Sequence, residues 1–199
     1  MRNFNMNLIQ LRSQYLVGAL LIFLVVMTRS HHFISLDQLP GASWAVFFLA
    51  GFYIRSNRML PGLLILVWSL DFGSYYFGNS SSFCITPAYL FLLPAYTSLW
   101  IAGRIYAHYH RNTLQSLLYL GVFTFIGASV CELFSSGGFY FYSGRFVDPT
   151  LTEFLDRVIL YFPSSLQSMG FYVIMATIVH ILFYMIKVKV NEKNGIVKS

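Results

Sequence analysis

Cys84 is the residue whose setting points most directly to chemistry. It ends a polar, serine-rich stretch, GNSSSFC, and Thr86-Pro87 and a long apolar run follow it. Thr86 is a suitable N-cap and proline is favoured at the first position of a helix, so a helix is predicted to begin at Pro87. The positive end of a helix dipole favours thiolate over thiol, and a thiolate is a soft ligand for a transition metal. Cys84 is therefore either a metal ligand or a small residue at a loop–helix junction.

Three further candidates lie on either side of this cysteine. Asp71 interrupts an apolar stretch, where an ionised side chain costs free energy and by default indicates function. The structural alternative is that Asp71 caps a short helix or pairs with an arginine. Tyr75 and Tyr89 could stack on a flat ligand, although tyrosines are also common where a helix meets the membrane interface.

The remaining candidates lie in polar segments. Arg29 and His31 follow the first apolar run, and His31 and its neighbouring histidine are either metal ligands or solvated loop residues. Arg157 lies in a charged stretch further along. It either contacts a ligand or pairs on an amphipathic surface helix with the acidic residues just before it, Glu153 and Asp156.

The composition indicates that an integral membrane protein positions these residues. Of the 199 residues, 57% are hydrophobic and only 10% are charged, whereas a soluble domain carries about 25% charged residues. The apolar runs recur at the spacing of one bilayer crossing, and they lack the two-residue alternation of a membrane β-barrel. The net charge of +6 is explained by orientation in the membrane, so nucleic acid is not expected as a partner.

The chain is predicted to form a single all-α domain, a bundle of six transmembrane helices in the lipid bilayer. The short spans must extend into flanking residues or lie partly inside the bundle, because a helix needs roughly 20 residues to cross a membrane. A long outward loop is expected over residues 135–162, with Pro163 opening the last span. The six spans are expected at about 11–28, 43–54, 61–77, 87–105, 114–134 and 163–186.

The basic residues predict the orientation of this bundle. Ten of the 13 lysines and arginines fall on the side that carries both termini, and the other three fall on the opposite side. By the positive-inside rule both termini are cytoplasmic. The candidate residues named above then gather on the outer face, which favours a site that takes up a molecule from outside.

Motifs of common enzymes are absent from the sequence. It contains no H-E-x-x-H, no G-x-S-x-G and no P-loop. Two cysteines are too few for a disulfide framework. Because no ATP-binding motif is present, active uptake would require a partner protein.

Two segments carry a family resemblance. The stretch from Phe83 to Tyr89, FCITPAY, together with the stretch from Trp44 to Gly51, WAVFFLAG, resembles BtuM, a family of small bacterial vitamin B12 transporters. BtuM is itself similar to the substrate-binding S-components of energy-coupling-factor transporters. The resemblance extends from Arg29 to about Arg157.

The resemblance implies a fold, a substrate and a role for Cys84. The expected protein is a six-helix, multi-pass protein of the bacterial inner membrane that binds cobalamin near its outer surface. A cysteine placed like Cys84 coordinates the cobalt, whose four equatorial ligands come from the corrin, and exchange of the upper cobalt ligand is an expected side activity. Asp71, Tyr89 and the outward arginines are expected to contact the amide side chains of cobalamin. An energy-coupling-factor module is the expected partner.

Two alternatives from other functional classes remain open. The first is a membrane enzyme that handles thiols or metals through His31, His32, Cys84 and Asp71. The second is a non-catalytic assembly factor whose outer loops bind another protein.

Overall fold

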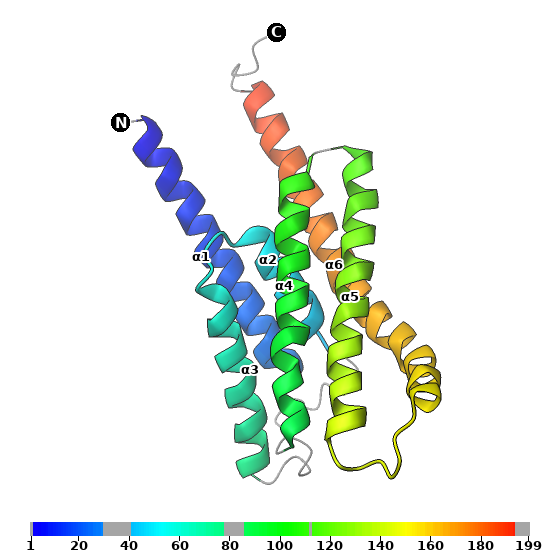
Figure 1. Ribbon diagram of the computed structural model, residues 1–199. Helices are drawn as coiled ribbons and strands as arrows, with labels where there is room; N and C mark the ends of the chain where they lie inside the picture. The colour runs from blue at the N-terminus through cyan, green and yellow to red at the C-terminus, as the bar shows by residue number, and fades with distance from the viewer. Residues whose placement is uncertain (1, 30–40, 78–85, 112, 194–199) are drawn as a thin grey trace.

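The protein is all-helical over the residues that its computed structural model describes, which are 2–29, 41–77, 86–111 and 113–193. The predicted all-α fold is confirmed for this part of the chain, and no β-strand occurs in it. Each predicted span overlaps one helix, and a 3₁₀ helix precedes the fourth. The elements, shown in Figure 1, are α1 (Arg2–Arg29), α2 (Ser43–Tyr53), α3 (Met59–Tyr76), η2 (Pro87–Phe91), α4 (Leu92–Tyr109), α5 (Leu114–Tyr142) and α6 (Leu151–Lys193).

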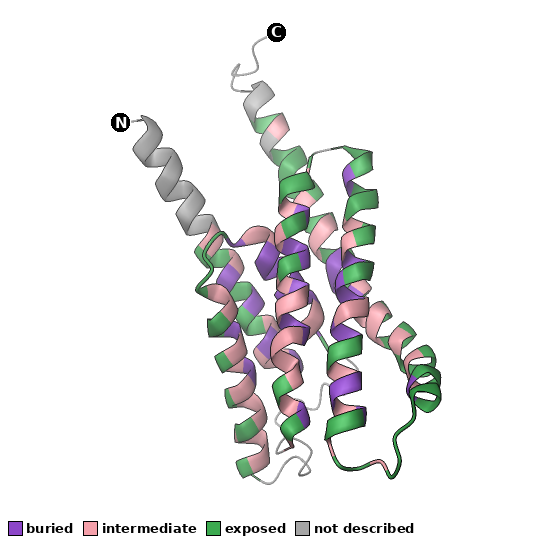
Figure 2. Ribbon diagram, in the orientation of Figure 1, coloured by how far each residue is buried: buried purple, intermediate pink, exposed green. Residues whose placement is uncertain are grey.

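Helix α2 forms the centre of the bundle and packs against α1, α3, α4, α5 and α6. Its residues from Ala45 to Gly51 are all buried, as the colouring of Figure 2 shows. A helix that is apolar on all sides is expected to be enclosed by other helices. Its 11 residues extend only roughly 16 Å, about half of the hydrocarbon thickness of a bilayer. The WAVFFLAG segment is therefore a core element that is too short to cross a membrane alone.

Two glycines bring the backbones of α2 and α4 into direct contact. A Cβ atom added at Gly51 would clash with the Trp100 carbonyl oxygen, and one added at Gly103 would clash with the Phe48 carbonyl oxygen. Small residues at a helix crossing permit this close approach. The crossing fixes α2 against α4, and both helices contribute residues to the candidate sites described below.

Two helices are long and apolar enough to cross a membrane by length and composition: Leu114–Tyr142, which is α5, and Leu151–Val190 within α6. Gln14–Arg29 and Ser43–Tyr53 are shorter apolar helices. Large apolar side chains on the outer surfaces of α5 and α6 are exposed, for example Leu118, Ile159 and Phe183. Extensive exposed apolar surface is unusual for a soluble monomer, so the surface is compatible with a membrane environment.

The prediction of a loop over residues 135–162 is wrong. Helix α5 continues to Tyr142, and only residues 143–150 connect it to α6. The Ser-Ser-Gly-Gly sequence belongs to α5 because Gly138 leaves room for the Phe91 side chain, and because the Ser136 hydroxyl bonds to a glutamate one turn earlier. Pro163 lies inside α6 rather than at its start. A proline inside a helix removes one hydrogen bond and bends the helix, and α6 does not run straight in Figure 1.

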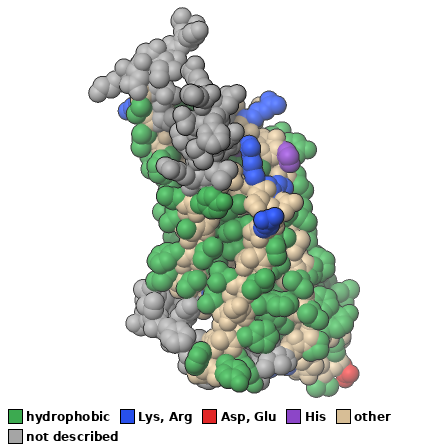
Figure 3. All heavy atoms as spheres, turned by 90° about the vertical axis from the view of Figure 1, so that its left-hand side faces the viewer, with side chains coloured by type: hydrophobic (Ala, Val, Ile, Leu, Met, Phe, Trp, Pro, Cys, Tyr) green, Lys and Arg blue, Asp and Glu red, His purple; other side chains and the backbone are tan. Residues whose placement is uncertain are grey.

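The bundle has two distinct ends. The first turns of α1 and the last turns of α6 lie at one end, called here the terminal end, and the α4–α5 connection points the same way (Figure 1). In Figure 3, lysine and arginine side chains gather toward this end, apolar side chains cover the middle, and an acidic side chain lies at the opposite end. The ends of α1 and α3, helix η2 and the start of α4 meet at the opposite end.

Candidate functional site

An ion pair at the opposite end joins α1 to α3. The Arg29 guanidinium donates from Nε to Asp71 Oδ1 and from Nη2 to Asp71 Oδ2, each at 2.6 Å. The two side chains are only 20% and 13% exposed. A bidentate arginine–carboxylate pair of this kind is stronger and more directional than a single charged hydrogen bond. The last residue of α1 is therefore held against α3, 42 positions later in the sequence.

The third nitrogen of Arg29 extends the network to two further helices. Nη1 donates to the Ser43 hydroxyl at 2.8 Å and to the Tyr96 hydroxyl at 3.1 Å. The Tyr96 ring stacks on Phe47 of α2, with ring centroids 4.5 Å apart. Arg29 thus connects the ends of α1 and α3 with the start of α2 and the first turns of α4.

Tyr89 completes the network from η2. Its hydroxyl donates a short hydrogen bond to Asp71 Oδ2, and its ring lies against Trp68 and Phe72 of α3. Three residues predicted from the sequence, Arg29, Asp71 and Tyr89, therefore lie in one cluster. We call this cluster, which also includes Ser43 and Tyr96, the Arg29–Asp71 network. Both carboxylate oxygens and all three guanidinium nitrogens have partners within it.

Two buried polar atoms beside Tyr89 have no hydrogen-bond partner among the described residues. They are Trp68 Nε1 and Thr86 Oγ1. Thr86 occupies the N-cap position, but the expected side-chain cap is absent, because the Tyr89 N–H is taken by the Thr86 carbonyl oxygen in a 3₁₀ turn. Unsatisfied buried donors cost free energy, so both atoms are suited to meet an acceptor supplied by a ligand.

The other predicted site residues do not all join this cluster. Tyr75 is half-buried on α3, four residues after Asp71 and so on the same face of the helix, without a recorded contact to the network. Cys84 and His31 lie outside the described residues. Arg157 belongs to a separate cluster between α5 and α6.

The α5–α6 cluster is built around aromatic rings. Arg157 donates to Glu153 at 2.9 and 3.2 Å and lies over the Phe146 ring, 4.6 Å from its centroid. The Tyr140 hydroxyl donates to the same glutamate at 3.0 Å. Arg157 therefore pairs with the acidic residue one turn before it, which is the structural alternative that the sequence left open.

A cavity of about 420 Å³ lies beside this cluster. Its wall includes Glu132, which is buried and accepts a 2.5 Å hydrogen bond from Ser136. Cys131, the residue before it, is a free thiol enclosed in the core. Among the described residues no group of three or more His, Cys, Asp or Glu side chains could hold a metal ion.

No family model matches the chain, and no curated protein matches it. Its function must therefore be argued from its own residues.

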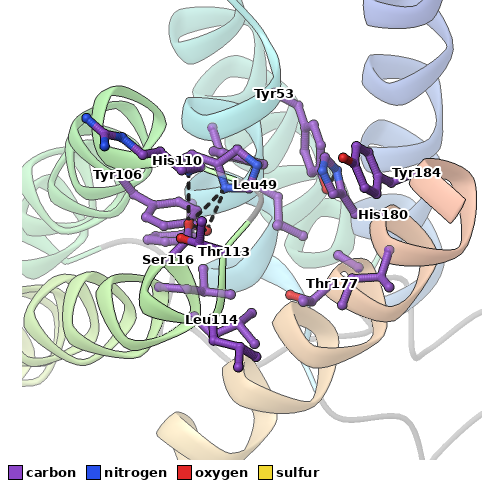
Figure 4. Close-up of a pocket in the computed structure, with 17 residues that line it drawn as sticks. Leu49, Tyr53, Tyr106, His110, Thr113, Leu114, Ser116, Thr177, His180 and Tyr184 are labelled. Carbon is purple, nitrogen blue, oxygen red and sulfur yellow. Dashed lines mark hydrogen bonds between the residues drawn. The ribbon is translucent and has the colours of Figure 1, made fainter. Parts of the chain in front are cut away.

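A second pocket, toward the terminal end, was not predicted from the sequence. It has a volume of about 270 Å³ and lies between α2, α4, α5 and α6. Figure 4 shows His110 and His180 in its wall, with Tyr53 and Tyr106 near them. The two histidines are 70 positions apart and on different elements, so no local spacing in the sequence reveals the pair.

Proposed function

We propose that the protein is a cobalamin-binding uptake protein of the bacterial inner membrane, with the Cys84 thiolate as an axial ligand of cobalt. The observation that carries the proposal is the Arg29–Asp71 network. It fixes the end of α3 and the start of η2, which are the two anchor points of the segment that contains Cys84. Cys84 stands two positions before Thr86 in the sequence.

The surface supports a membrane setting with six spans. Apolar side chains cover the middle of the molecule and basic side chains gather toward the terminal end (Figure 3). Arg55, Arg58 and Arg111 are exposed in the turns that face this end. With the positive-inside rule, this distribution favours cytoplasmic termini and an outward-facing Arg29–Asp71 network.

The geometry divides the candidate residues into two roles. Arg29, Asp71 and Tyr89 bond to one another, so we assign them to positioning the site. Trp68 Nε1 and Thr86 Oγ1 have no hydrogen-bond partner among the described residues, and the amide side chains of cobalamin carry carbonyl acceptors for them. The corrin supplies four nitrogen ligands to cobalt, so a single soft thiolate is sufficient to hold the metal.

Replacing Cys84 tests the cobalt–sulfur bond. We expect the visible absorption bands of cobalamin bound to the purified wild-type protein to shift in Cys84→Ala, because a thiolate ligand is lost from the metal. Cys131→Ala is the matched control: its thiol is enclosed in the core, so the spectrum should stay that of the wild type. A colourless wild-type protein, or a Cys84→Ala spectrum identical to the wild type, would contradict the proposal.

Energised uptake requires a partner. Since the chain has no ATP-binding motif, we propose that an energy-coupling-factor module drives active transport. Without such a partner the protein can only equilibrate cobalamin across the membrane.

A further inference from the structure

The pocket toward the terminal end has a buried polar floor. The Tyr106 hydroxyl and His110 Nδ1 share a hydrogen bond of 2.9 Å, and Ser116 Oγ lies 3.2 Å from both. The backbone N–H of Arg111 donates to the same serine oxygen at 3.2 Å. In one consistent arrangement the Ser116 hydroxyl donates to the Tyr106 oxygen and the Tyr106 hydroxyl donates to His110 Nδ1. His110 then carries its hydrogen on Nε2.

His180 makes a similar contact with a tyrosine and packs edge to face against His110. The Tyr53 hydroxyl and His180 Nδ1 share a hydrogen bond of 3.2 Å, and the two imidazole rings lie 5.3 Å apart between centroids. Neither Nε2 atom has a recorded partner among the described residues. When Tyr53 donates to Nδ1, His180 also carries its hydrogen on Nε2, so each ring keeps one N–H donor for a ligand. Figure 4 shows both histidines among the residues that line the pocket.

The chemistry of the wall favours an anion over a cation. None of the lining residues is acidic, and Arg111 stands at the rim. Burial lowers the pKa of His110, and the neighbouring His180 lowers it further, so the neutral form of His110 is favoured at neutral pH. A charge-assisted hydrogen bond to an anion is about twice as strong as one between neutral groups.

The rest of the lining is hydrocarbon. Leu114, Leu117 and Ile181 form an exposed apolar rim between α5 and α6, while Phe48 and Leu49 close the floor. A cavity of 150 Å³ holds benzene. By proportion, about 270 Å³ holds roughly ten non-hydrogen atoms.

We propose that this pocket binds a carboxylate amphiphile, an aliphatic acid of medium chain length. Its carboxylate accepts hydrogen bonds from the His110 and His180 side chains, and its hydrocarbon chain runs toward Leu117 and Ile181. The site is at the other end of the bundle from the Arg29–Asp71 network, and the proposal is independent of cobalamin binding.

Octanoate, with about ten non-hydrogen atoms, is the probe, titrated calorimetrically into the full chain purified in detergent. We expect octanoate to bind at least roughly tenfold more tightly than octanol, because the alcohol cannot form charged hydrogen bonds. Octylamine should bind no better than octanol, and acetate should not displace octanoate. Equal affinity for octanoate and either comparator, displacement by acetate, or no binding of octanoate would overturn the proposal.

Variants locate the carboxylate. The double variant His110→Phe/His180→Phe should lose the preference for octanoate over octanol. His108→Phe, an exposed histidine on the same helix outside the pocket, should retain it. If the double variant fails to fold, Leu117→Trp at the rim should still abolish octanoate binding by filling the pocket. Retained preference in the double variant, its loss in His108→Phe, or unchanged binding in Leu117→Trp would contradict the assignment.

A series of chain lengths separates two sources of the acid. Affinity that stops rising near eight to ten carbons, as the pocket volume suggests, identifies a soluble acid that the pocket encloses. Affinity that continues to rise identifies a membrane fatty acid whose chain leaves through the apolar rim between α5 and α6. Both results support a carboxylate site.

Discussion

Asp71→Asn should destabilise the protein by about 3–5 kcal/mol, the cost of breaking a buried ion pair by removing one partner. Arg29 and Asp71 are at most one-fifth exposed, so solvent replaces little of the lost interaction. The guanidinium would keep the neutral hydroxyls of Ser43 and Tyr96 as acceptors, and Tyr89 would lose a charged acceptor. Thermal or denaturant unfolding of the purified protein in detergent measures the change.

A double variant tests whether the loss comes from the unpaired charge. Arg29→Met/Asp71→Leu removes both charges and should be more stable than either single variant, because apolar replacements of a buried pair are often close to neutral. Glu153→Gln is the control: it breaks a pair whose side chains are 38% and 50% exposed, and it should change stability little. The interpretation fails if Asp71→Asn is as stable to unfolding as the wild type. It also fails if the double variant is no more stable than the less stable of the two single variants.

The same double variant separates positioning from ligand contact. If the network acts by positioning alone and the apolar replacements still hold α3 and η2 in place, the double variant should bind cobalamin with the affinity of the wild type. If Arg29 and Asp71 themselves bind the amide side chains, affinity should fall although the fold is retained.

The helices were predictable because each apolar run is bounded by polar or proline-containing segments. The ends of the helices were harder to predict, because Ser135 and the two glycines after Ser136 are typical of loops. Inside α5 these small residues instead admit Phe91 and Phe154 against the helix. That contact depends on η2 and α6, which are distant in the sequence.

Three members of the Arg29–Asp71 network, Arg29, Asp71 and Tyr89, were named from the sequence, but their pairing was not. The sequence marked Asp71 as costly in an apolar stretch, and pairing with an arginine was one of its interpretations. It could not select Arg29 over Arg145 or Arg157, because the choice depends on which helix ends meet. No sequence pattern predicted the second pocket, because His110, His180 and Tyr53 come from separate elements.

Gly103→Ala should lower the free energy of unfolding by about 3 kcal/mol or more. This is a large effect for one added carbon and lies at the upper end of the cost of overpacking a core. The added Cβ would meet the Phe48 carbonyl oxygen, a backbone atom of α2 that cannot rotate away. Gly51→Ala meets the Trp100 carbonyl oxygen in the same way. Relief therefore requires α2 and α4 to separate, and thermal unfolding together with the monodisperse fraction on size-exclusion chromatography measures the result.

Gly121→Ala is the matched control because nothing lies within 4 Å of a Cβ added at this exposed position of α5. It should raise stability by about 0.5–1 kcal/mol, since alanine loses less conformational freedom than glycine in a helix. The packing argument fails if Gly103→Ala is as stable as the wild type or if Gly121→Ala is equally damaging. The double variant Gly51→Ala/Gly103→Ala should cost less than the sum of its parts, because one separation of α2 from α4 relieves both clashes.

Separating α2 from α4 should also disturb both candidate sites. Helix α2 carries Ser43 into the Arg29–Asp71 network at one end and Tyr53 into the second pocket at the other. Helix α4 carries Tyr96 and Tyr106 to the same two places. Gly103→Ala, although it touches neither site, should therefore weaken both cobalamin and octanoate binding, whereas either set of site variants should affect only its own ligand.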